Sequence, residues 1–238
     1  YNIIPLTISN GCRYKCRFCK VKNKKPFKPR SRADITGQIR ALKQLYGTDL
    51  INQNAIFLGE HDALNSPADL IIDSIREAVG TLNFKASYMQ DQYVFIFASA
   101  DALLEKETSF FDELNRMGVY TFINVGLESY DTDTLKKLGK PLKKETVKEA
   151  FDRIQDINRR FPMIEISCNF LMDDTLSDAH YSALSELIRE SVPRPCPKGA
   201  VYLSPLKFDQ PSRQVLYDFY SLKTKSRFPT FLYIIQRL

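Results

Sequence analysis

The sequence predicts an α/β fold in which parallel strands form a sheet and helices lie outside it. Short apolar runs alternate along the chain with longer segments whose apolar residues recur at the spacing of a one-sided helix. The runs are continuously apolar, which is typical of strands in a parallel sheet that helices cover. We therefore expect six strand-then-helix units.

The chain length also bounds the organisation. A chain of 238 residues fits one large domain, and α/β barrels of this size fold as a single unit. No linker, low-complexity segment or further internal repeat is visible, so we expect one domain over residues 1–238. The chain begins with Tyr1 rather than Met, so we expect that it was trimmed or belongs to a longer protein.

Six apolar runs are expected to form the strands, because each has the length of a buried strand. They cover residues 3–9, 55–58, 93–98, 120–127, 164–171 and 200–203. The apolar tail from Phe231 to Ile235 is expected to pack across an open edge or end of the sheet.

The segments between these strands are expected to be helices. In the first of them, Ile35 and Ile39 lie one turn apart and Gly47 ends the helix. Pro26 and Pro29 prevent an earlier start. The expected helices cover residues 31–46, 67–80, 101–117, 131–138, 143–160, 177–191 and 212–224.

Three cysteines, Cys12, Cys16 and Cys19, lie within eight residues directly after the first expected strand. Thiolates this close in sequence converge on one loop. Three convergent thiolates suit a soft metal or an iron–sulfur cluster. A 4Fe–4S cluster normally takes four cysteines, so three ligands leave one iron open to a substrate or cosubstrate.

Two other interpretations compete with a cluster. A structural zinc site needs a fourth ligand, and neither His61 nor His180 lies close to the cysteines in sequence. A disulfide is disfavoured by the odd count of five cysteines and by the lack of a secretion signal. Cys168, inside an apolar strand, is expected in the core. Cys196 lies in a proline-rich loop, and the two do not form the motif of an auxiliary cluster.

Polar residues follow the expected strands at their carboxyl ends, where ligands bind in parallel α/β folds. If the topology is right, these residues share one mouth with the cysteines. They are Gly59, Glu60, His61, Asp62, Ser99, Asp101, Glu128, Ser129, Asn169, Met172 and Ser204. Among them, His61 is a candidate general acid or base near neutral pH.

The cysteine spacing, with Phe18 directly before the last cysteine, resembles the signature of the radical S-adenosylmethionine (SAM) superfamily. The resemblance implies a partial (β/α)6 barrel, which the six expected units match. It also implies a 4Fe–4S cluster on Cys12, Cys16 and Cys19 whose free iron chelates the amino and carboxylate groups of SAM. One electron then cleaves SAM to methionine and a 5′-deoxyadenosyl radical, which abstracts hydrogen from a substrate.

The turn after the second expected strand resembles two patterns of this superfamily. Gly59-Glu60 matches the middle of a Gly-Gly-Glu-Pro-like turn, whose carbonyls and carboxylate hold the SAM ammonium. The segment from Gly59 to Leu64 matches a Gly-Asp-x-Asp-x-Leu variant. The resemblance therefore implies Gly59, Glu60 and Asp62 as SAM contacts. Either carboxylate can bind an ammonium, so which of the two faces SAM is open.

Gly126-Leu127-Glu128-Ser129, followed by a segment that ends at Lys140, resembles the fourth-strand region of one branch of the superfamily. That branch contains methylthiotransferases and the elongator catalytic subunit. The resemblance implies Glu128 as a SAM contact and Ser129 as a second one. Asn169 is a candidate for the ribose hydroxyls, and Ser99 is a further candidate contact. The lack of a second multi-cysteine motif disfavours enzymes that need two clusters.

The net charge of +6 is concentrated beside the cysteines. Residues 13–32, the basic strip, hold ten basic residues and no acid. Such a strip can steer an anionic partner toward the site. Three such partners are an acidic one-electron donor such as flavodoxin or ferredoxin, an anionic substrate, or RNA. Few aromatic residues accompany the charges, so nucleic acid is not favoured from charge alone.

The sequence has no apolar run long enough to cross a membrane and no signal peptide, so we expect a cytoplasmic protein. Three hypotheses remain. The first is a radical SAM enzyme with an unknown substrate. The second is a metal- or cluster-carrying nucleic-acid-binding module that uses the basic strip. The third is an electron-transfer protein, which needs a fourth thiolate, with Cys196 as the candidate.

Overall fold

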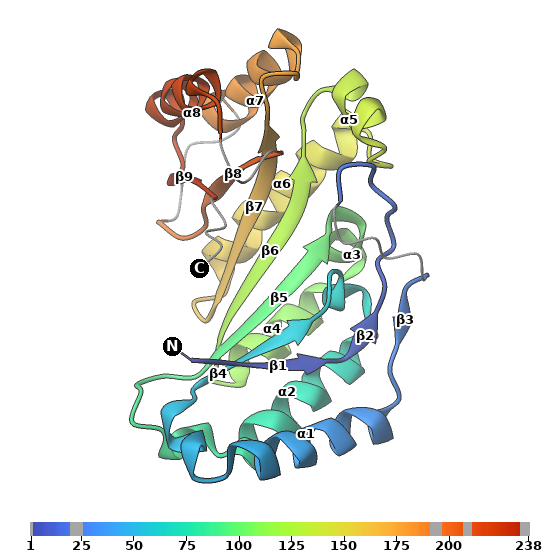
Figure 1. The fold of residues 1–238 in the computed structure, drawn as a ribbon, viewed down its shortest axis with the longest axis vertical. Coiled ribbons are helices and arrows are strands. Elements are labelled where there is room, and N and C mark those ends of the chain that lie inside the picture. The colour runs from blue at the N-terminus through green and yellow to red at the C-terminus, as the bar shows by residue number, and fades with distance from the viewer. Residues whose placement is uncertain (1, 20–25, 191–196, 207–210, 234–238) are drawn as a thin grey trace. The chain divides into compact units, whose positions relative to one another are not determined.

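The computed structural model describes residues 2–19, 26–190, 197–206 and 211–233 (Figure 1). The chain divides into two compact units. Unit 1 comprises Tyr1–Arg13, Asn23–Asn124 and Phe161–Glu165, and unit 2 comprises Tyr14–Lys22, Val125–Arg160 and Ile166–Leu238.

Nine strands form among the described residues. They are β1 (Ile3–Thr7), β2 (Ser9–Asn10), β3 (Lys28–Pro29), β4 (Ala55–Gly59), β5 (Tyr93–Ser99), β6 (Tyr120–Glu128), β7 (Ile164–Met172), β8 (Val201–Pro205) and β9 (Thr230–Leu232). Seven of them form one sheet in the order β1-β4-β5-β6-β7-β8-β9, and β2 pairs separately with β3. Neighbours in the large sheet run parallel, which confirms the α/β expectation.

Eight α-helices accompany these strands in the described part of the chain. They are α1 (Arg32–Tyr46), α2 (Ala68–Leu82), α3 (Ala100–Glu105), α4 (Thr108–Arg116), α5 (Thr132–Leu138), α6 (Lys144–Arg160), α7 (Asp178–Glu190) and α8 (Arg213–Lys225). Short 3-10 turns lie at Gly47–Asn52, Ala63–Asn65 and Phe84–Ala86. None of the helices described is long and apolar enough to cross a membrane.

The first expected strand is shorter than the apolar run suggested. It ends at Thr7, and Ser9–Asn10 instead pairs antiparallel with Lys28–Pro29. Pro5 is tolerated in β1 because β1 is an edge strand of the sheet, where an amide hydrogen is dispensable. The β2–β3 pairing joins the start of the cysteine loop to the chain that leads into α1.

The expected helix over 101–117 is two helices, α3 and α4. The chain between them is extended at Lys106, whose ammonium donates to the Ser66 carbonyl oxygen at 2.7 Å and lies 5.6 Å from the centre of the Phe110 ring. The extended Lys106 backbone separates the two helices, and its side chain ties this break to the chain before α2. In the sequence alone, the apolar spacing of both helices reads as one.

The apolar tail forms a seventh strand that the six-unit expectation lacked. Thr230–Leu232 pairs in parallel with β8, with Val201 opposite Thr230, so this part of the tail extends the edge of the sheet. Tyr233 follows the strand, and its backbone N–H donates to the Leu203 carbonyl oxygen at 2.8 Å. Ile234 and Ile235 lie outside the described ranges.

Side chains of the strands alternate between two faces. In unit 1, one face is fully buried and includes Ile4, Leu6, Ile56 and Leu58. In unit 2, Val125, Leu127, Ile166 and Phe170 are buried in the same way. Burying each such side chain stabilises the fold by about 1.5–3 kcal/mol, so these residues hold the strands whose ends carry the candidate site.

Candidate functional site

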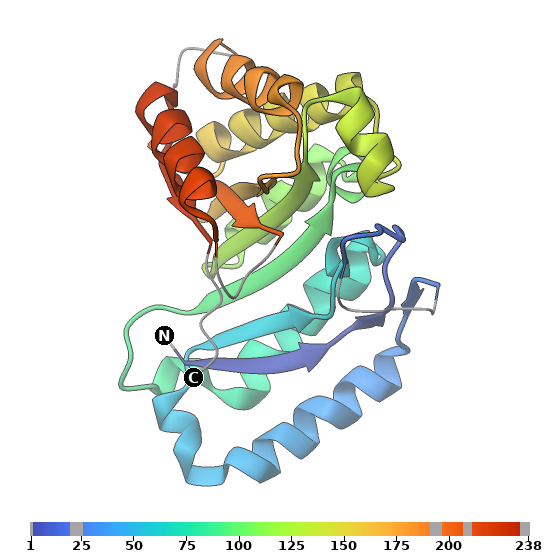
Figure 2. The ribbon, with the colours of Figure 1, turned by 45° about the horizontal axis from the view of Figure 1, so that its top comes forward.

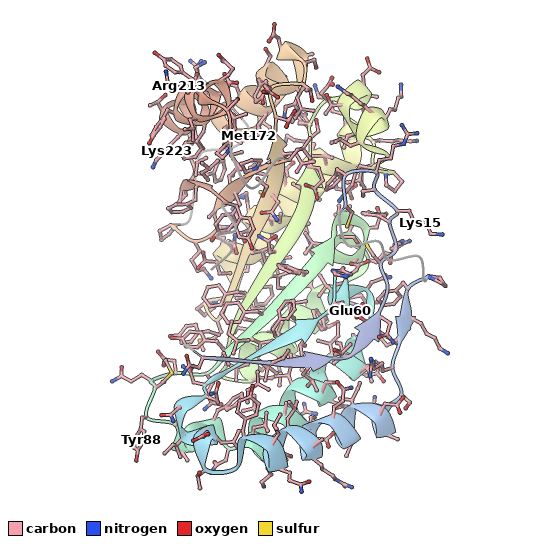
Figure 3. The ribbon with its side chains drawn as sticks, viewed as in Figure 1. Lys15, Glu60, Tyr88, Met172, Arg213 and Lys223 are labelled. Carbon is pink, nitrogen blue, oxygen red and sulfur yellow. The ribbon has the colours of Figure 1, made fainter. Side chains whose placement is uncertain are left out.

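Glu60 directly follows β4 and contacts the chain that leads into the cysteine loop (Figure 3). Its Oε2 accepts a hydrogen bond from the backbone N–H of Gly11 at 3.4 Å. Gly11 has φ +82°, a conformation that favours glycine. Cys12, the next residue, is a half-buried thiol. Within unit 1, the structure therefore brings the candidate Glu60 carboxylate beside the first cysteine of the motif.

Asp62 and Ser99 make a different arrangement in the same unit. Asp62 is fully buried, and its Oδ1 accepts a hydrogen bond from the Ser99 backbone N–H at 2.8 Å. The Ser99 hydroxyl oxygen accepts from the N–H of Ala102 at 3.3 Å and caps α3. These contacts tie the ends of β4 and β5 together. Gly59 is buried beside them, and His61 is half-buried.

In unit 2, the second half of the cysteine loop lies against the end of α5. The Arg17 backbone N–H donates to the Leu138 carbonyl oxygen at 2.9 Å, and Phe18 packs on Leu138, Leu171 and Leu176. The Cys19 N–H donates to the Cys16 carbonyl oxygen at 3.3 Å, which forms a turn between the two cysteines. Apolar packing and backbone hydrogen bonds therefore anchor this part of the loop.

Glu128 ends β6 and forms a buried ion pair. Its Oε1 lies 3.2 Å from Lys140 Nζ, and the two side chains are only 11% and 5% exposed. The Lys140 ammonium also lies 4.9 Å from the centre of the Tyr14 ring, which belongs to the cysteine loop. A cation over an aromatic face is attracted to it, so Lys140 links Glu128 to the cysteine loop within unit 2.

Gly126 makes room for this ion pair. A Cβ at this position would lie 2.5 Å from Glu128 Oε1 and 3.3 Å from Lys140 Nζ. Because residues two apart on a strand share a face, any side chain at 126 would push the carboxylate away. Steric exclusion therefore explains why the Gly-Leu-Glu-Ser segment begins with a glycine.

Ser129 is fully buried in a hydrogen-bonded group with His180. The Ser129 Oγ lies 2.8 Å from His180 Nδ1, and His180 Nε2 lies 2.9 Å from the Leu171 carbonyl oxygen. Nε2 is therefore the protonated nitrogen, and Nδ1 accepts the Ser129 hydroxyl hydrogen. Burial lowers the pKa of His180, which keeps the ring neutral. No local pattern in the sequence indicates this pairing.

We expect this buried histidine to make folding stability pH-dependent. A histidine in the unfolded chain titrates near its usual pKa of about 6.5, whereas the lowered pKa of His180 keeps the folded chain unprotonated there. The free energy of unfolding should therefore fall as the pH drops below about 6.5, until the folded pKa is reached. Urea unfolding from about pH 7.5 to about pH 5 measures this slope. A His180→Gln variant should show a shallower slope, and equal slopes would contradict the buried neutral ring.

The candidate Asn169 and its neighbour Cys168 lie on β7. Asn169 is half-buried and sits opposite Tyr202 of β8. Cys168 is 2% exposed, and burial raises the pKa of its thiol, so it lies in the core as expected. Cys196 lies outside the described residues.

The basic strip is partly neutralised where it is described. Arg13 Nη1 lies 2.6 Å from Glu105 Oε1, and Arg32 pairs with Asp69 and Asp73 of α2. These acids come from distant parts of the sequence, so the local charge count overstates the positive field. The strip's residues 20–25 lie outside the described ranges.

The three thiols of the motif match a cluster by their donor chemistry. Cys12 and Cys16 are half-buried and Cys19 is exposed. Across the described ranges, no three His, Cys, Asp or Glu side chains stand close enough together to hold a metal ion. Soft thiolates on one short loop are nevertheless the ligand set that iron–sulfur clusters take.

The comparisons with known proteins identify the class. The sequence matches the radical SAM superfamily over residues 6–172, and no curated protein matches the chain. A radical SAM methyltransferase from Sphaerobacter thermophilus has a similar structure, with a TM-score of 0.64 and 15% identity, over 99% of this chain and 67% of that one. SuiB from Streptococcus suis has a TM-score of 0.56 and 12% identity over 97% and 48% of the two chains. Methylornithine synthase (PylB) has a TM-score of 0.54 and 13% identity, over 95% of this chain and 63% of that one.

The chain belongs to the radical SAM superfamily, because the match covers more than half of it and includes the cysteine motif. Members of this superfamily are enzymes that use a 4Fe–4S cluster and SAM. The fold is the partial (β/α)6 arrangement that the sequence led us to expect. The chain spans about two thirds or less of the solved structures named above.

Proposed function

We propose that the chain cleaves SAM reductively and uses the resulting radical to abstract hydrogen from a substrate. Cys12, Cys16 and Cys19 would hold a 4Fe–4S cluster. When bound, the cluster supplies the electron that splits SAM into methionine and a 5′-deoxyadenosyl radical. The observation that best supports the proposal is the Glu60 carboxylate beside Gly11, because it puts an anionic group next to the first cysteine.

Glu60 is proposed, in preference to Asp62, as the carboxylate that binds the SAM ammonium. Glu60 is half-buried and contacts the cysteine loop, whereas Asp62 is fully buried and accepts from the Ser99 backbone. The proposed role of Asp62 and Ser99 is to fix the ends of β4 and β5. Gly59, buried at the end of β4, would let the backbone approach the ligand.

The proposed roles in unit 2 follow from burial. Glu128 is buried and one of its carboxylate oxygens is paired with Lys140, so we propose that it contacts SAM through the other oxygen. Ser129 would position this turn through His180 rather than through a direct SAM contact. Asn169 is proposed for the ribose hydroxyls, and His61 for proton transfer.

Anaerobic reconstitution tests the proposed function. The chain is loaded with iron and sulfide, reduced with dithionite and mixed with SAM. We expect about four irons per chain and reductant-dependent formation of 5′-deoxyadenosine. Salt-sensitive RNA binding without any SAM cleavage would instead favour the nucleic-acid-binding alternative.

Glu60→Gln tests the ammonium contact. Loss of a charge-assisted bond removes about 1.5–3 kcal/mol, so SAM should bind about tenfold to a hundredfold more weakly. Equilibrium dialysis of SAM against the reconstituted chain measures this.

The matched variant Asp62→Asn should lower the free energy of unfolding and change SAM affinity less than Glu60→Gln does. The reverse order of the two affinities would show that Asp62, not Glu60, binds the ammonium.

The electron source is proposed to be a small acidic protein such as flavodoxin or ferredoxin. In the described part of the basic strip, Lys15, Arg17 and Lys28 are exposed. These cations would attract an acidic donor at low salt.

A further inference from the structure

One face of the unit 1 sheet is aromatic and only partly covered. The opposite face packs on helices, with α1 and α2 on the same side of β1 and β4 (Figure 2). The other side carries six rings from β4, β5 and the start of β6, here called the aromatic face: Phe57, Tyr93, Phe95, Phe97, Tyr120 and Phe122. Phe97 is 40% exposed and Tyr120 is 37% exposed, and the other four are half-buried.

The rings of the aromatic face contact one another across neighbouring strands. Phe95 and Phe122 stack with centroids 5.3 Å apart, and Tyr93 and Tyr120 stack at 5.7 Å. Phe57 meets Phe97 edge to face at 5.1 Å. The sheet register sets Pro5, Phe57 and Phe95 in one row. The result is a surface of aromatic rings in contact across three strands.

The aromatic face carries no charge. None of the side chains that alternate onto it from β1, β4, β5 and residues 120–124 is acidic or basic. Charge first appears at its amino end, where the Tyr93 hydroxyl donates to Asp91 Oδ2 at 3.4 Å. A charged ligand group would lose its hydration on this face without gaining a counter-charge. An uncharged ring would gain stacking and apolar contact.

Such a partly exposed aromatic face is a candidate binding surface. Parallel sheets are normally covered on both faces, and exposed apolar patches of this kind mark binding sites. The strands that carry the rings end at Gly59 and Ser99, beside Glu60 and Asp62. The aromatic face therefore leads directly to the end of the unit 1 sheet that carries the proposed SAM-binding carboxylate.

We propose that the aromatic face binds the substrate through an uncharged aromatic ring or another planar apolar group. The inference rests on the proposed function, because it assigns the substrate class of that reaction. It replaces the expectation of an anionic substrate, which came from the basic strip, with an uncharged group on this face.

Fluorescent indoles test the proposal, because the chain contains no tryptophan and gives no indole background. N-acetyltryptophanamide is the neutral probe, and indole-3-acetate presents the same ring with a negative charge. In anisotropy titrations of the full chain, the neutral probe should bind, p-cresol should displace it, and indole-3-acetate should bind more weakly. Tighter binding of indole-3-acetate would overturn the proposal.

Variants locate the binding. Phe95→Leu/Phe122→Leu keeps the surface apolar and removes two rings, and should weaken probe binding about tenfold. Phe97→Leu is the milder second variant, at an exposed position, and should weaken it about threefold. Tyr217→Leu on α8, at a side chain that is 78% exposed, should change nothing. Equal affinities for all the variants, or a dimer that only the ring variants dissociate, would overturn the proposal.

Experiments can distinguish a failure of the proposed function from a failure of the ring-binding proposal. Cys16→Ala should bind the probe as the unaltered chain does, because the aromatic face needs no cluster. Probe binding by a chain that never forms 5′-deoxyadenosine would overturn the proposed function and keep the ring-binding face. SAM cleavage without probe binding would overturn the face and keep the function.

Discussion

Replacing Cys16 by alanine is expected to leave the reconstituted chain without its iron and without 5′-deoxyadenosine. A three-cysteine cluster that loses one ligand retains two thiolates for four irons, too few to hold it. Wild-type chain should carry about four irons, and Cys16→Ala close to none. Iron and sulfide assays after anaerobic desalting measure both, with chromatography of the nucleoside product beside them.

Cys168→Ala is the matched control for this cysteine replacement. Cys168 lies inside β7, and burial raises the pKa of its thiol, so the thiolate that metals require is disfavoured. The variant should keep the wild-type iron content. Loss of iron from Cys168→Ala, with iron retained by Cys16→Ala, would contradict the ligand assignment.

The second large effect is expected at the Glu128–Lys140 ion pair. Glu128→Ala leaves the Lys140 ammonium buried without its carboxylate, and removing one partner of a buried pair costs about 3–5 kcal/mol. The free energy of unfolding of the metal-free chain, from urea titration, measures the loss. The double variant Glu128→Ala/Lys140→Met removes the stranded charge and should recover part of it.

An exposed pair provides the control. Lys148 Nζ lies 2.6 Å from Asp152 Oδ2, one turn apart on α6, with side chains 37% and 45% exposed. Asp152→Ala should cost less than about 1 kcal/mol, because solvent screens such pairs. A Glu128→Ala variant no less stable than Asp152→Ala would show that the β6 pair is not buried as described.

Local sequence patterns predicted the elements well where helix spacing and apolar runs agreed. The helix expected over 31–46 is α1, capped by Ser31, whose hydroxyl accepts from the Asp34 N–H. The break at Lys106 was missed because the apolar spacing continues across it, and the contact of Lys106 with the Ser66 carbonyl, forty residues earlier, leaves no local pattern. The β2–β3 pairing was missed because its strands are too short to leave a pattern.

At the candidate site, the sequence could not predict contacts between residues that lie far apart along the chain. Nothing local in the sequence relates His180 to Ser129, which lies 51 positions earlier. The choice between Glu60 and Asp62 needed the contact with Gly11, which the chain order does not reveal. In the sequence, Lys140 was visible only as the end of the segment that follows Gly126–Ser129. Gly126, two residues before Glu128, was the local signal that a side chain at this position would collide with the carboxylate.

The most direct test is low-temperature electron paramagnetic resonance of the reduced, reconstituted chain, recorded with and without SAM. Three thiolate ligands leave one iron open, so addition of SAM should change the spectrum of the reduced cluster. A spectrum that SAM leaves unaltered, from a cluster held by four protein side chains, would contradict the account. So would a purified chain that binds zinc in place of iron.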